Sequence, residues 1–114
     1  NLDSVDLLFL ENVGNLVCPA EFDTGATCSI MLLSVPEGDD KVLKYPLMFT
    51  VCDLLLVTKT DCQAMFDFDL KKLTTRVHQL NPDMKIIPVS SKTGENMEAW
   101  ISWLKERREA FIKN

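Results

Sequence analysis

Two short polar segments hold the residue types best suited to chemistry in this chain. Residues 58–61 read Thr-Lys-Thr-Asp and follow an apolar run at 54–57, and residues 90–94 read Ser-Ser-Lys-Thr-Gly and follow a second run at 86–89. The carboxylate of Asp61 can accept hydrogen bonds from the ring N1–H and the exocyclic amine of guanine together, a pair of donors that adenine lacks. The two segments therefore predict a pocket that selects guanine.

Other groups of the two segments fit the same pocket. The Lys59 stem can lie along the base plane with its head toward the phosphates. The Ser91 backbone N–H can donate to the ring carbonyl, and the Ser90 hydroxyl can orient Asp61. Either segment alone is more typical of a strand-end turn with solvated charges, but both in this order favour nucleotide recognition. We predict six residues that contact GTP or GDP: Thr58, Lys59, Asp61, Ser90, Ser91 and Lys92.

Unbroken apolar runs identify the elements that must position these residues. Continuous rather than alternating hydrophobicity is typical of parallel strands covered on both faces. Four strands are expected, at residues 5–10, 28–35, 54–57 and 86–89. Apolar residues at helical spacing predict helices near residues 43–51, from Asp67 or Asp69 to Leu80, and from Met97 through Leu104. The expected fold is α/β, with a mostly parallel sheet flanked by helices and right-handed crossovers.

The first expected strand also ends in groups that suit a nucleotide. In open parallel sheets, ligands bind outside the carboxyl ends of the strands, where Glu11 and Gly14 fall. A carboxylate at Glu11 can hold Mg²⁺ directly or through water, and the N–H of Gly14 can approach a terminal phosphate. A strand-end Glu followed by a turn Gly is also common without any ligand, so this pattern alone leaves both readings open.

The four cysteines lie at positions 18, 28, 52 and 62, and no C-x-x-C spacing joins them. Three lie in or beside apolar runs, which is typical of buried free thiols, so we expect a reducing, cytoplasmic protein. Cys18 differs because it lies in a loop, where a thiolate can bind a soft or borderline metal. A site there needs further ligands, and His78 is expected to be a solvated helix residue rather than one of them.

Composition narrows the class of partner. The 114 residues carry a formal charge of −5 and show no basic stripe, so nucleic acid is not an expected partner. No apolar run reaches the roughly 18 residues of a membrane span, so no membrane partner is expected either. The chain begins at Asn1 and enters an apolar run almost at once, which suggests the middle of a longer protein. None of the four glycines belongs to a G-x-x-x-x-G-K-[ST] phosphate loop.

Three stretches of the chain resemble one family, the hydrogenase nickel-incorporation GTPases (HypB), which are hydrogenase maturation factors. They are residues 6–23, which contain Asn-Leu-Val-Cys-Pro, residues 37–49, and residues 90–103. The resemblance implies a GTP-hydrolysing metallochaperone with a P-loop NTPase fold of the SIMIBI type. It also implies that the full-length protein dimerises and works with nickel-delivery and hydrogenase maturation proteins to supply [NiFe] hydrogenase.

The same resemblance implies roles for residues near the start of the chain. Glu11 and Gly14 would belong to the catalytic switch that contacts Mg²⁺ and the γ-phosphate. Cys18 would be one ligand of a Ni²⁺ or Zn²⁺ site at the dimer interface, with an adjacent Cys-His pair of the family absent here. Thr58 stands where the family has Asn. A Thr at this position resembles the motif of signal-recognition-particle GTPases, so guanine recognition is expected to survive but to be weaker.

The missing phosphate loop has a consequence for activity. Residues 1–114 are expected to be the C-terminal portion of a single GTPase domain, and the isolated chain is expected to be catalytically inactive because phosphate affinity is lost. Two alternatives remain: a urease-accessory-type nickel GTPase, which shares the base-reading segments, and a non-catalytic α/β interaction module that keeps these segments as turns. Metal binding at Cys18 without hydrolysis is a further reading.

Overall fold

The computed structural model describes residues 7–11 and 27–113. Short 3₁₀ helices are labelled η. The elements in chain order are β1 (Ile30–Ser34), η2 (Val35–Glu37), α2 (Lys41–Lys44), α3 (Pro46–Val51), β2 (Leu54–Thr58), η3 (Thr60–Met65), α4 (Leu70–Leu80), β3 (Lys85–Pro88) and α5 (Met97–Lys113).

The three described strands form one parallel sheet in the order β1-β2-β3. The register aligns Leu32 of β1 with Leu56 of β2, and Leu56 with Ile87 of β3. Residues 54–57 of β2 are all buried, as expected for a central strand with helices on both sides. The predicted α/β fold with a parallel sheet is therefore confirmed, as are three of the four predicted strands.

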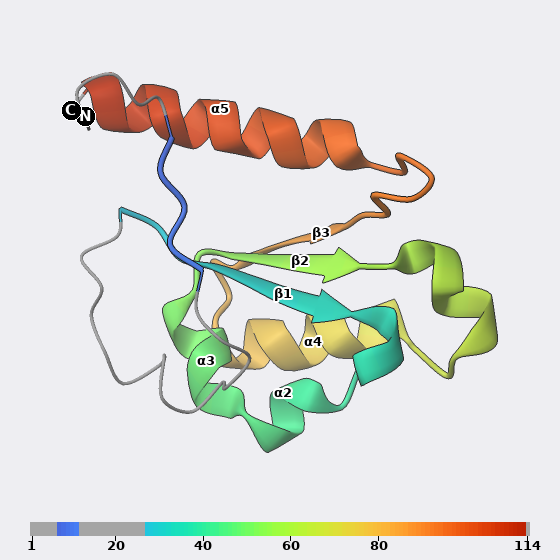
Figure 1. Cartoon of the computed structure of the whole chain (residues 1–114). Coiled ribbons are helices and arrows are strands. Elements are labelled where there is room, and N and C mark those ends of the chain that lie inside the picture. The colour runs from blue at the N-terminus through green and yellow to red at the C-terminus, as the bar shows by residue number, and fades with distance from the viewer. Residues whose placement is uncertain (1–6, 12–26, 114) are drawn as a thin grey trace.

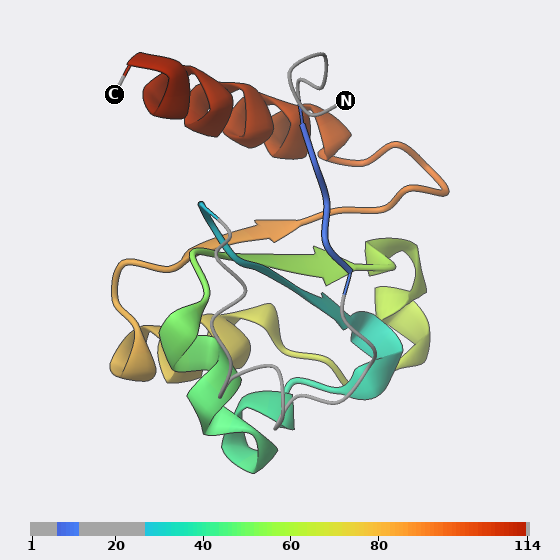
Figure 2. The same cartoon turned by 60° about the vertical axis from the view of Figure 1, so that its left-hand side comes forward.

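Helices cover both faces of this sheet. Figures 1 and 2 show α5 on one side and α2, α3 and α4 on the other. Alternate residues of β2 serve the two layers: Leu55 belongs to the core beneath α2–α4, and Leu56 to the core beneath α5. Trp103 of α5 is 5% exposed and stacks on Trp100, with ring centroids 6.1 Å apart. Both tryptophans are packing residues, as predicted.

The predicted start of α4 is confirmed at Asp69. Its carboxylate accepts hydrogen bonds from the backbone N–H groups of Lys71 and Lys72 and so satisfies donors that have no partner within the helix. Asp39, in the turn after β1, accepts a 2.6 Å hydrogen bond from the Asp69 N–H and lies 3.6 Å from the Arg76 guanidinium. This acidic turn therefore ties the end of β1 to α4.

The helix predicted near residues 43–51 is instead two short helices, α2 and α3. Pro46 begins the second one, and proline disfavours the helical backbone in the residue before it. Tyr45 accordingly has φ −133° and ψ 60°, which interrupts the helix. The bend lets Val42 and Phe49 both enter the core beneath the sheet.

The prediction of a buried strand at residues 5–10 is wrong for the part that the structure describes. Residues 7–11 form no strand, and they pass from the level of α5 to the level of the sheet (Figures 1 and 2). Leu8 and Phe9 are 75% and 63% exposed. An apolar run becomes a buried strand only when it pairs with a neighbour, and this segment does not pair with the outer edge of β1.

The three described cysteines are free thiols, as predicted. Burial, with the nearby charge of Asp53, raises the pKa of Cys52 to about 11, and burial is also the main cause that raises the pKa of Cys28. Both groups therefore stay protonated at neutral pH, which suits structural thiols. His78 is exposed on α4, and one of its ring nitrogens lies 3.0 Å from the Met84 carbonyl oxygen.

Among residues 7–11 and 27–113, no helix has the length and apolar character needed to cross a membrane.

Candidate nucleotide site at the carboxyl ends of β2 and β3

The first loop begins where β2 ends at Thr58. Lys59 adopts the left-handed conformation, with φ 59° and ψ 41°, which turns the chain sharply into η3. A side chain other than glycine reaches this region at a cost of about 1–2 kcal/mol, so the surrounding contacts must hold it. They include the backbone N–H of Thr60, which donates to the Val89 carbonyl at 3.3 Å, and that of Cys62, which donates to the Lys59 carbonyl at 3.0 Å.

The second loop follows β3 and closes on itself. The Ser90 N–H donates to the Glu95 carbonyl at 3.0 Å, and the Gly94 N–H donates to the Ser90 carbonyl at 2.9 Å. Gly94 has φ +82°, a conformation that glycine adopts without strain. The loop is therefore a compact turn, and Figure 1 shows it at the same edge of the sheet as η3.

One side-chain contact joins the two loops. The Ser90 hydroxyl donates a 2.8 Å hydrogen bond to Oδ1 of Asp61, although the residues lie 29 positions apart. Ser90 is fully buried, whereas Asp61 is exposed. The Thr93 N–H donates to the Ser90 hydroxyl at 3.2 Å, and the Cys62 thiol lies 3.7 Å from Oδ2 of Asp61. Asp61 is thus oriented from beneath, while its outer side faces solvent.

The electrostatics of the site favour an ionised acceptor. The hydrogen bond from Ser90 is the main cause that holds the pKa of Asp61 below its ordinary value, and the Cys62 thiol and the charge of Lys92 act in the same direction. A carboxylate that accepts hydrogen bonds in its charged form keeps that form at neutral pH. Asp61 therefore presents two acceptor oxygens at the rim of the sheet.

The structure brings most of the predicted nucleotide-contacting residues to this edge. Ser91 and Lys92 are exposed and follow the buried Ser90 directly. Their backbone N–H groups have no acceptor among residues 7–11 and 27–113, so they can donate to a ligand. Thr58 and Lys59 lie one turn before Asp61 on the neighbouring loop.

The predicted metal and phosphate contacts are not assembled by the described residues. Glu11 is exposed at the end of segment 7–11, and Gly14 and Cys18 lie outside the described residues. The described ranges contain no group of three or more His, Cys, Asp or Glu that could hold a metal ion. The assignments of Mg²⁺ to Glu11 and of Ni²⁺ or Zn²⁺ to Cys18 therefore stay predictions.

Sequence reasoning missed the role of three residues at this site, among them Asn96, which the sequence suggested only as a cap of the last helix. Thr93 supports Ser90 through its N–H, and the Asn96 side-chain amide donates to the Pro88 carbonyl at 2.9 Å. The hydroxyl of Thr60 is buried with no partner among the described residues, which leaves a hydrogen-bonding group unused beside Asp61. The available signal for Asn96 was its residue type, since asparagine tolerates the left-handed region better than most residues.

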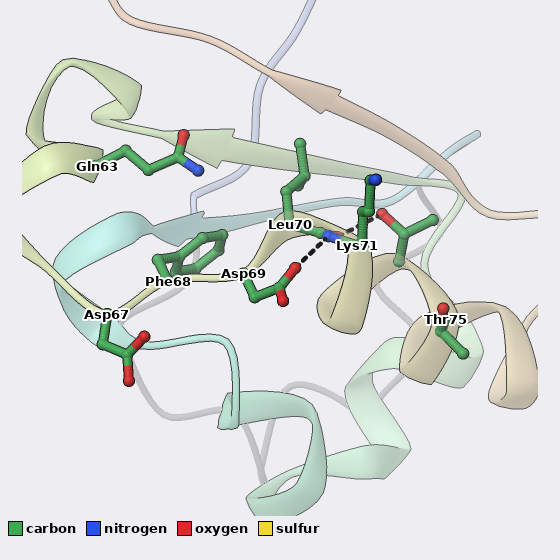
Figure 3. A pocket seen from close by; sticks show the side chains of 8 residues that line it. Gln63, Asp67, Phe68, Asp69, Leu70, Lys71 and Thr75 are labelled. Carbon is green, nitrogen blue, oxygen red and sulfur yellow. Dashed lines mark hydrogen bonds between the residues drawn. The ribbon is translucent and has the colours of Figure 1, made fainter.

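An open groove of about 850 Å³ lies elsewhere on the described surface (Figure 3). Its lining comes from the end of η3 and the first turns of α4: Gln63, Asp67, Phe68, Asp69, Leu70, Lys71, Thr74 and Thr75. Figure 3 shows the Asp69 carboxylate turned to the backbone of its own helix, where it serves as the cap. The groove contains none of the base-reading residues, so we do not assign the nucleotide to it.

Comparison with known proteins supports a nucleotide-binding role. A family model described as "CobW/HypB/UreG, nucleotide-binding domain" matches residues 1–88. The chain is 49% identical over 107 residues to a protein of Azotobacter chroococcum named "Hydrogenase maturation factor HypB", and 43% identical over 107 residues to the "Hydrogenase/urease maturation factor HypB" of Helicobacter pylori. These alignments cover 94% of the chain but only 35% and 44% of those two relatives.

A solved structure gives the same result. The crystal structure of HypB from Helicobacter pylori in complex with nickel superimposes with a TM-score of 0.82 at 42% sequence identity, over 86% of this chain and 46% of that one. The chain thus spans less than half the length of these relatives. It belongs to the CobW/HypB/UreG family of nucleotide-binding domains and is homologous to HypB hydrogenase maturation factors over most of its length.

Proposed function

We propose that residues 1–114 are the C-terminal, guanine-reading portion of a GTP-hydrolysing nickel metallochaperone for [NiFe] hydrogenase maturation. The observation that carries this proposal is the 2.8 Å contact between the buried Ser90 and the exposed Asp61. It fixes an ionised carboxylate at the carboxyl ends of parallel strands, where open α/β sheets bind their ligands.

Guanine recognition follows from the groups at this edge. The two oxygens of Asp61 accept from the N1–H and the 2-amino group of guanine, and the Ser91 N–H donates to the 6-oxo group. Adenine presents neither the N1–H donor nor the 6-oxo acceptor. An ionised acceptor makes stronger hydrogen bonds than a neutral one, so Asp61 dominates the preference.

Hydrolysis and metal transfer depend on residues beyond this edge. Phosphate binding requires a phosphate loop, which the 114 residues lack, so the isolated chain does not hydrolyse GTP. The assignment of nickel as cargo is supported by the HypB neighbour solved in complex with nickel. Cys18 is the residue of this chain proposed to bind it, in a dimer of the full-length protein, and Glu11 and Gly14 are proposed for the Mg²⁺ and γ-phosphate switch.

A role in urease maturation is the second candidate. One relative, from Helicobacter pylori, carries the name "Hydrogenase/urease maturation factor HypB". Nickel transfer from the full-length protein to apo-urease and to apo-hydrogenase, measured side by side, separates the two roles.

The decisive experiment measures the affinities of the full-length protein for GDP and ADP in the wild type and in Asp61→Ala. Each hydrogen bond to a charged group contributes about 1.5–3 kcal/mol, so we expect the preference for GDP to fall by about 100-fold or more. Asp67→Ala is the matched control, because Asp67 is also exposed but lies outside the two loops. An unchanged preference in Asp61→Ala supports the interaction-module alternative instead.

The metal role has its own test. Cys18→Ser in the full-length protein is expected to lose Ni²⁺ or Zn²⁺ binding, measured by equilibrium dialysis, because a serine hydroxyl does not replace a thiolate ligand. Cys28→Ser is the control for the loss of a free thiol outside the two loops. Metal binding that persists in Cys18→Ser rejects the proposed ligand.

A further inference from the structure

Asn96 is a residue of the second loop to which the proposed function assigns no role. It lies between Gly94 and the start of α5, and its φ of +59° places it in the left-handed region. Its side-chain amide donates to the Pro88 carbonyl at 2.9 Å. Asn96, at the end of the loop, is thereby hydrogen-bonded to the last residue of β3, the strand that leads into the loop.

Pro88 is a suitable acceptor because of its position on β3. The backbone of the next residue, Val89, faces β2 and the first loop. Its N–H donates to the Val57 carbonyl, and its carbonyl accepts from the Thr60 N–H. Within the described sheet β3 is an edge strand, so its outward carbonyls lack a strand partner. Asn96 supplies the donor for Pro88.

Two contacts therefore close the base of the loop. One is the backbone pair between Ser90 and Glu95, and the other is the contact between Asn96 and Pro88. Between them lie Ser91 and Lys92, whose N–H groups have no acceptor in the described part of the chain. A loop whose two ends are held together by hydrogen bonds loses less conformational entropy when a ligand binds to it.

We propose that Asn96 is a positioning residue that holds the Ser91 N–H where it reads the 6-oxo group of guanine. This inference rests on the proposed function of the same site. Asn96 hydrogen-bonds Pro88 and not Asp61, which is oriented by the Cys62 thiol and by the hydroxyl of Ser90, the buried first residue of the loop. The two halves of base recognition are therefore separable by mutation.

Three nucleoside diphosphates test this separation in the full-length protein. GDP carries the 6-oxo group, the N1–H and the 2-amino group. Inosine diphosphate lacks the 2-amino group, and 2-aminopurine riboside diphosphate lacks the 6-oxo group and the N1–H. A defect in the second loop weakens the first two only. A defect at Asp61 instead removes the preference for GDP over inosine diphosphate.

Two substitutions remove the amide of Asn96 in different ways. Asn96→Gly keeps access to the left-handed region, and Asn96→Asp keeps the size of the side chain but loses the donor. For both we expect about threefold to tenfold weaker binding of GDP and inosine diphosphate, which is the worth of one hydrogen bond. Binding of 2-aminopurine riboside diphosphate is expected to stay within about twofold of wild type.

The control is Asn81→Asp. The amide of Asn81 also donates to backbone carbonyls, those of Phe49 and Cys52, but Asn81 lies just after α4, at the opposite edge of the sheet. It is expected to lower stability without changing the relative affinities of the three diphosphates. Equal weakening of all three in the Asn96 variants, or no weakening of any, overturns the positioning role.

Failure of the inference and failure of the proposed function are distinguishable. If Asp61→Ala loses the preference for GDP over inosine diphosphate while the Asn96 variants bind all three as wild type does, only the role of Asn96 is wrong. If Asp61→Ala retains that preference, guanine reading at this edge is wrong, and the inference about Asn96 is wrong with it.

Discussion

We expected two regions to lie at the ligand side of the sheet: the two base-reading loops and residues 7–11. The structure shows that the two regions are built very differently. The loops are joined by the Ser90–Asp61 and Thr60–Val89 hydrogen bonds. Segment 7–11 has no regular structure, and its four apolar side chains are 44–75% exposed. The loops therefore take their shape from strands inside this chain, whereas the segment does not.

The difference has a simple physical origin. β2 and β3 pair with each other, so the residues that follow them are delivered side by side by a register that this chain contains. An apolar run such as residues 7–10 gains stability only when a neighbouring strand takes its backbone groups and covers its side chains. The base-reading half of the site is therefore self-supporting, and the following predictions test that view in order of expected effect.

The largest expected effect compares two phenylalanines. Phe49 is fully buried beneath the sheet, and Phe9 is 63% exposed. Phe49→Ala is expected to lower the free energy of unfolding by about 3–5 kcal/mol because it leaves a cavity, whereas Phe9→Ala changes it by about 0.5 kcal/mol or less. Urea unfolding of the 114-residue chain measures both. Equal losses would show that segment 7–11 belongs to the core after all.

The second expected effect is a loss of stability at alkaline pH. The folded pKa of Cys52 is about 11, above its ordinary value of 9.0. The contribution of Cys52 to the free energy of unfolding is therefore complete below pH 9.0 and is lost as pH rises through 11. The reason is that the thiol loses its proton at lower pH in the unfolded chain than in the folded protein. We expect a loss of about 1–2 kcal/mol over this interval, given partial contact with solvent.

The matched variant for this test is Cys52→Ala, followed by urea unfolding at several pH values. Every other side chain is the same in both proteins, so the difference in slope isolates the thiol of Cys52. Identical slopes for the two proteins between pH 9 and 11 would contradict the burial of Cys52.

The third effect concerns the start of α4. Asp69→Ala removes the acceptor for two backbone N–H groups, and we expect the free energy of unfolding to fall by about 1 kcal/mol. Asp67→Ala removes a nearby exposed carboxylate that has no cap role and is expected to be close to neutral. Amide hydrogen exchange at Lys71 and Lys72 should accelerate only in Asp69→Ala. Equal exchange in both variants would reject the cap.

The smallest expected effect is a change in the pKa of Asp61 at the nucleotide site. Ser90→Ala removes the main cause of the lowered pKa of Asp61, so that pKa should rise toward its ordinary value. A carboxyl group whose pKa is lower in the folded state stabilises the fold at pH values above its unfolded pKa. This stabilisation is lost as pH falls through the folded pKa. In Ser90→Ala the titration of Asp61 therefore begins at higher pH. Carbon-13 NMR of the Asp61 carboxyl group measures this, with Ser91→Ala as the control that should leave it unchanged.

Prediction from the sequence succeeded where the signal was local. The apolar runs located three strands, helical spacing located α4 and α5, and Asp69 was one of the two residues expected at the start of α4. The contact between Ser90 and Asp61 was also expected, because strand-end residues of neighbouring parallel strands share one edge. The prediction failed for residues 7–11, since an unbroken apolar run does not reveal whether a pairing partner is present.

By itself, the sequence determined which segments become strands and helices and which residue types stand at the sheet edge, because periodicity and capping act over a few neighbouring residues. Only the tertiary structure decided that Asn96 bonds Pro88, that Asp39 joins α4, and that the Thr60 hydroxyl is buried without a partner among the described residues. These contacts depend on the register between strands and the angles of the loops, which many distant residues set together.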